Sequence, residues 1–106
     1  MLNNDQIKEI NNRIEDLYKY LQIEKKKIEI SNDDEKTAAP EFWDNPKEAE
    51  AFLKQLRSKK KWVEEYNTIY TDFEDLQVLY EFAKEDPDSE KELDDNYPKL
   101  LEKIEG

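Results

Sequence analysis

Apolar residues recur at every third or fourth position along most of this chain, which is the period of an α-helix with one buried face. The longest such run lies between residues 46 and 85 and has no internal proline or glycine. Asn45 suits an N-terminal cap, Pro46 suits the first helical position, and Glu48 can complete a capping box. A helix of this length cannot bury its own apolar stripe, so other helices must lie along it.

Two shorter runs flank this long helix. The first covers about residues 4–31, with apolar positions at Ile7, Ile10, Ile14, Leu17, Leu21 and Ile28 and with Ile23 and Ile30 off that stripe. The second covers about residues 90–105, where Ser89 and Glu92 can form a capping box and Pro98 should kink or delay the helix. Residues 32–45 form a connector. We therefore expect an all-α fold, an elongated antiparallel three-helix bundle of coiled-coil-like character, as a single helical domain over residues 1–106.

The connector also predicts a register between the helices. Counted back from it, the first helix should cover the long helix as far as about residue 72. Lys59–Lys61 should then lie near Glu15 and Asp16 and form ion pairs with them. An aromatic-rich midsection of the long helix is expected to belong to the core, as helically spaced aromatic residues usually do; it contains Trp62, Val63, Tyr66, Tyr70 and Phe73.

Two large aromatic residues, Phe42 and Trp43, stand in the connector between Pro40 and Pro46. The prolines restrict the residues before them to extended conformations. We expect the aromatic rings to fold back and close the open end of the helical hairpin. The alternative is that one ring stays exposed and binds a partner, so Phe42 and Trp43 are the candidate partner contacts.

Composition excludes most catalytic chemistry. There is no histidine and no cysteine, and the single glycine is Gly106, so imidazole bases, thiolate nucleophiles, zinc sites and glycine-rich phosphate loops are out. The acidic turn at residues 86–97 begins like a calcium loop, but Lys91 replaces the required glycine and Tyr97 the final glutamate. We expect no enzyme activity, no catalytic or metal-binding residues and no cofactor.

The formal net charge is -11, which disfavours autonomous binding to nucleic acid. No apolar run approaches the roughly 20 residues of a membrane span, and the N-terminus does not have the pattern of a signal peptide. A soluble, cytoplasmic protein that acts through protein partners, without a membrane, is the expectation.

Four segments in a fixed order carry a resemblance: residues 20–29, 40–49, 73–83 and 85–88. Pro40-Glu41-Phe42-Trp43-Asp44 is the most specific of their sequences. Together they resemble the N-terminal helical domain of the bacterial peptide chain release factor 2 family, the class I factors that read UGA and UAA. The resemblance covers nearly all 106 residues.

This resemblance implies a function in translation termination and an N-terminal fragment of a longer protein. The family's Ser-Pro-Phe recognition motif and Gly-Gly-Gln hydrolysis motif are absent here, so the resemblance carries over no decoding or catalytic residue. It implies that this domain positions the factor or contacts partners and does not catalyse. The partners that it implies are the GTPase-associated region of the ribosome and the GTPase that recycles the factor. A bundle that buries its own stripe should be monomeric. The alternative is a free-standing acidic coiled-coil adaptor that acts by protein–protein interaction and self-associates.

Overall fold

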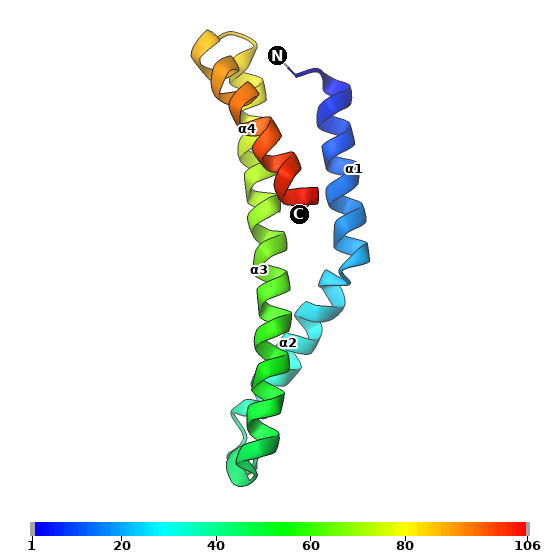
Figure 1. The fold of residues 1–106 in the computed structure, drawn as a ribbon, viewed down its shortest axis with the longest axis vertical. Coiled ribbons are helices and arrows are strands. Elements are labelled where there is room, and N and C mark those ends of the chain that lie inside the picture. The colour runs from blue at the N-terminus through cyan, green and yellow to red at the C-terminus, as the bar shows by residue number, and fades with distance from the viewer. Residues whose placement is uncertain (1, 106) are drawn as a thin grey trace. The chain divides into compact units, whose positions relative to one another are not determined.

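The computed structural model describes residues 2–105, and all of its regular structure is helical. The helices are α1 (Asn4–Tyr20), α2 (Ile23–Thr37), the short 3-10 helix η1 (Pro40–Asp44), α3 (Pro46–Ala83) and α4 (Pro87–Glu105). Figure 1 shows α3 as one unbroken helix. The all-α prediction and its long helix are thereby confirmed.

The contacts divide the chain into two compact units, and α3 runs through both of them. Unit 1 contains residues 2–17 and 67–105, and unit 2 contains residues 18–66. In unit 1, α1 and α4 both pack on the C-terminal half of α3. The buried side chains there include Ile10, Ile14, Phe73, Leu76, Leu93 and Leu100.

Polar contacts join the three helices of unit 1. The Tyr80 hydroxyl of α3 donates a hydrogen bond of 2.8 Å to the Asn4 side-chain oxygen at the start of α1. Arg13 of α1 pairs with Glu105 at the end of α4, at 3.3 Å. Lys103 of α4 pairs with Asp72 of α3. Because such exposed ion pairs contribute about 0 to 1 kcal/mol each, they orient the helices, while the buried apolar residues supply most of the stability.

In unit 2, α2 and the N-terminal half of α3 form a hairpin around η1 (Figure 1). Ile23, Ala49, Leu56 and Tyr66 are buried there. The rings of Tyr18 and Tyr66 meet at 5.3 Å between centroids. Lys60 pairs with Asp34 at 3.1 Å. Unit 2 is therefore a two-helix hairpin closed by the last turn of α1.

The helix predicted over residues 4–31 is divided into α1 and α2, and α2 continues to Thr37. The break lies at Leu21–Gln22, where Gln22 adopts a left-handed conformation with φ 52° and ψ 47°. The Lys26 ammonium donates a hydrogen bond to the Leu21 carbonyl, which α1 leaves without a helical partner. A residue in the left-handed conformation turns the following helix about its axis. The apolar positions after Gln22 therefore do not continue the three-and-four spacing of those before it. Ile23 is consequently buried and Ile28 is 59% exposed, the reverse of the prediction.

The starts of α1, α3 and α4 follow the capping rules, with one change of residue, whereas α2 begins after Gln22 without a side-chain cap. Asn3 and Gln6 exchange two hydrogen bonds of 2.9 Å at the start of α1. The Asn45 side chain accepts from the Glu48 amide at 3.3 Å, as predicted for α3. At α4 the cap is Asp86, which accepts from the Asp88 amide at 3.0 Å, so the helix begins before Ser89. Pro87 then takes the first helical position, and α4 continues through Pro98.

The predicted register is wrong, because α2 extends past residue 31 and moves the turn of the hairpin. Asn4 reaches Tyr80 instead of residue 72. Lys59 pairs with Glu29 and Asp33 of α2 instead of Glu15 and Asp16. The aromatic midsection is only partly core, because Trp62 and Tyr70 are nearly half exposed while Phe73 is buried.

Candidate functional site

The candidate partner contacts lie at the corner between α2 and α3, in unit 2. Pro40 opens η1 after the extended residue Ala39, and Asn45 ends it in an extended conformation. The ring of Phe42 meets the ring of Phe52 on α3 at 5.3 Å between centroids. It also meets Trp43 edge to face at 5.0 Å. These are favourable aromatic geometries, so Phe42 anchors the corner to α3.

Trp43 does not close the hairpin. Its side chain is 58% exposed, whereas Phe42 is half-buried. The expectation that both rings fold back is therefore wrong for Trp43. The reason is geometric, because successive residues of a tight helical turn point in different directions, and Phe42 already occupies the position against Phe52. The structure leaves a large aromatic surface open to solvent.

Beside Trp43 the surface is hollowed into a groove of about 310 Å³, lined by Trp43, Pro46, Ala49, Glu50, Leu53 and Arg57. Pro46, Ala49 and Leu53 give it an apolar floor along the first turns of α3. Glu50 and Arg57 supply one charge of each sign. Such a groove can take an apolar side chain of a partner against the indole ring.

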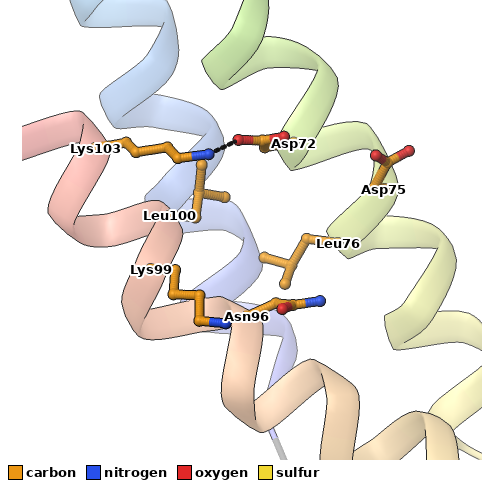
Figure 2. Close-up of a pocket in the computed structure, with 7 residues that line it drawn as sticks. All are labelled: Asp72, Asp75, Leu76, Asn96, Lys99, Leu100 and Lys103. Atoms are coloured by element: carbon orange, nitrogen blue, oxygen red, sulfur yellow. Dashed lines mark hydrogen bonds and ion pairs between the residues drawn. The ribbon is translucent and has the colours of Figure 1, made fainter.

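A second hollow lies between α3 and α4 in unit 1, with a volume of about 180 Å³. Figure 2 shows Lys103 of α4 paired with Asp72 of α3 across it, above Leu76 and Leu100. The ion pair neutralises one charge of each sign at this hollow. Among the described residues, no group of three or more carboxylates that could hold a metal ion is found.

The main electrostatic feature of unit 2 is Lys59. Its ammonium lies 2.9 Å from a carboxylate oxygen of Asp33, which is buried, and 3.2 Å from Glu29. The hydrogen bond to Asp33, followed by that to Glu29, raises the pKa of Lys59 above its usual 10.5. Burial acts in the opposite direction and lowers the pKa. Lys59 therefore holds α2 against α3.

The exposure of Trp43 gives a direct prediction. Trp43→Ala should change the free energy of unfolding by less than about 1 kcal/mol, because an exposed ring leaves no core cavity. Phe52→Ala, which removes the ring that Phe42 packs on, is the matched comparison and should cost more. Urea unfolding followed by circular dichroism measures both. A loss of several kcal/mol in Trp43→Ala would contradict the exposed position of the indole.

Comparison with curated proteins shows that the chain is similar to bacterial peptide chain release factors. The relatives in question are named peptide chain release factor 2. That of Petrotoga mobilis is 28% identical over 81 residues, which are 76% of this chain and 22% of the relative. That of Streptomyces avermitilis is 28% identical over 92 residues, 85% of this chain and 25% of the relative. That of an Exiguobacterium species is 30% identical over 78 residues, 74% of this chain and 21% of the relative.

The resemblance to release factor 2 that the four sequence segments indicated is thereby confirmed. The chain spans about a fifth to a quarter of the length of these curated relatives. No family model matches the chain. No solved structure matches it either. Within the described residues, no helix is long and apolar enough to cross a membrane.

Proposed function

We propose that this chain is the N-terminal accessory domain of a translation termination factor that directs peptide release at UGA and UAA stop codons. The observation that carries the proposal is the similarity to several proteins named peptide chain release factor 2, which extends over 74% to 85% of this chain in the three relatives above. The domain positions the factor or contacts its partners, and it does not itself catalyse a reaction. Its 106 residues contain neither a Ser-Pro-Phe nor a Gly-Gly-Gln motif, so decoding and hydrolysis are assigned to other parts of the protein.

The proposed partners are the GTPase-associated region of the ribosome and the GTPase that recycles the factor. Two features of unit 2 support a contact role. Trp43 presents an exposed indole at a corner, and the groove beside it has an apolar floor. Tryptophan is among the residues that most often dominate binding energy at protein interfaces. Trp43 is therefore the proposed anchor, and Phe42 holds it in place through the edge-to-face contact.

The decisive experiment uses the complete product of the gene. Its reading frame should continue into a domain with Ser-Pro-Phe and Gly-Gly-Gln motifs. The purified product should release a labelled peptide from ribosomes stopped at UGA or UAA, and it should be inactive at UAG and at a sense codon. Release at UAG without release at UGA would contradict the proposed codon specificity. A reading frame that ends at Gly106, together with a stable dimer in sedimentation equilibrium, would favour the adaptor alternative.

Trp43→Ala in the complete product tests the contact role. Loss of an interface anchor costs about 2 kcal/mol or more, which corresponds to at least tenfold weaker binding. We expect the concentration needed for half-maximal release to rise about tenfold, while the rate at saturating factor and the codon preference stay unchanged. An unchanged half-maximal concentration would remove Trp43 from the interface without affecting the codon assignment.

A further inference from the structure

A second exposed apolar surface lies on α3 in unit 1. Val78 and Phe82 are 54% and 61% exposed, although Leu76, Tyr80 and Ala83 on the same helix are buried. Val78 and Phe82 are four residues apart, so they lie one above the other on the helix surface. At 100° per residue they point away from the face that packs on α1 and α4. We call this pair the outer stripe.

Carboxylates surround the outer stripe. Glu74, Asp75, Glu81 and Glu85 are all exposed and lie within one or two turns of it. Between residues 67 and 86 the only basic residue is Lys84. The Lys84 ammonium pairs with Glu81 at 3.3 Å and lies 5.1 Å from the centre of the Tyr80 ring. Lys84 therefore neutralises one carboxylate and leaves the rest of the rim negative.

The negative charges around the outer stripe indicate which kind of partner can bind there. An acidic rim repels nucleic acid and anionic lipid headgroups. A second copy of the chain would place the same carboxylates opposite one another, which is destabilising. A helix with Lys and Arg beside an apolar face complements both the stripe and its rim. Scattered exposed apolar residues are common on proteins, but two on one helical face inside a single-sign rim form a patterned surface.

We propose that the outer stripe, Val78 and Phe82 on α3, binds a basic amphipathic helix of a partner protein. Apolar residues of that helix, spaced three and four apart, cover Phe82 and Val78. Its flanking lysine or arginine residues reach Glu74 at one end and Glu85 at the other. The small size of the stripe makes the contact transient, with a large electrostatic share in the association rate. This inference rests on α3 alone and does not depend on the proposed function.

The test uses the 106-residue chain and a fluorescent 18-residue helical peptide of leucine and lysine, with leucines at positions three and four apart. Fluorescence anisotropy measures the dissociation constant. We expect Phe82→Ala to weaken binding about tenfold and Val78→Ser to weaken it several-fold. Glu74→Gln combined with Glu85→Gln should also weaken it and reduce its dependence on salt. Circular dichroism confirms that each variant keeps the helical content and unfolding midpoint of the parent.

Ile28→Ala is the matched control, because Ile28 is 59% exposed, to a similar extent as Phe82, but lies on α2 in unit 2. It should leave the affinity for the peptide unchanged. A peptide of the same composition with its leucines scrambled should bind at least tenfold more weakly than the amphipathic peptide. Equal binding of the two peptides, or of Phe82→Ala and the parent, would reduce the effect to general attraction between opposite charges and overturn the proposal. Dimerisation of the parent that Phe82→Ala abolishes would overturn it in favour of a second copy.

Discussion

Ile23→Ala is expected to destabilise the protein by about 2 to 5 kcal/mol, the range for a large aliphatic residue removed from a core. Ile23 is 0% exposed, and it is the first residue of α2 after the left-handed Gln22. Its side chain thus fills the interior of unit 2 at the point where the helix changes direction. Alanine would leave a cavity there, and the rigid α2–α3 hairpin can close it only in part.

Ile28→Ala is the matched control for this change, because it makes the same substitution on the same helix at a residue that is 59% exposed. It should stay within about 0.5 kcal/mol of the parent, since alanine also has the higher helix propensity. Both tryptophans, Trp43 and Trp62, lie in unit 2. Urea unfolding followed by tryptophan fluorescence therefore reports on the unit in which both substitutions lie. Equal effects of the two substitutions would refute the shift of the apolar stripe at Gln22, which buries Ile23 and exposes Ile28.

Lys59→Met should cost about 1 to 3 kcal/mol, because it leaves the buried carboxylate of Asp33 without its cation. Methionine keeps most of the length and apolar stem of lysine, so the loss is electrostatic. Lys60→Met is the neighbouring control. Lys60 pairs with Asp34 at 3.1 Å, but both side chains are exposed to a greater extent, so less than about 1 kcal/mol is expected. Urea unfolding at pH 7 measures both variants.

The pH dependence of Lys59 has a definite sign. Its pKa is raised in the folded protein above the usual 10.5, so folding favours the protonated ammonium. The stability that this group contributes is complete below pH 10.5 and is lost as the pH rises through the folded-state pKa. The difference in stability between the parent and Lys59→Met should therefore shrink as the pH is raised above 10.5. A difference that stays constant to pH 12 would show that lost packing, and not the ion pair, destabilises the variant.

The two exposed surfaces can be separated by experiment because each lies within a different unit. Trp43 belongs to the corner of unit 2, and Phe82 belongs to the outer stripe of unit 1. Neither side chain is needed to fill a core, so alanine at either position should leave the fold intact. A change in release with one variant and in peptide binding with the other would assign separate partners to the two surfaces.

Local signals in the sequence were sufficient to predict much of this fold. The long helix α3 follows from an unbroken apolar period and from the cap at Asn45, because both act within a few residues of the chain. The all-helical class follows from the same period and from the scarcity of glycine. Phe42 and Trp43 were identifiable as unusual residues of the connector, and the segments around them already carried the resemblance to release factor 2.

Only the tertiary structure decided the break at Gln22, the register of the hairpin and which aromatic rings are exposed. The break had a trace in the sequence, since Ile23 and Ile30 lie off the predicted stripe, but an irregular stripe does not by itself show where a chain turns. Register depends on where α2 ends, and small changes there move every later contact, including the pairs of Lys59. Exposure of Phe82 depends on what packs around α3, because helical spacing states which residues share a face and not whether another helix covers it. Exposure of Trp43 depends on which ring of the connector takes the position against Phe52, and that ring is Phe42.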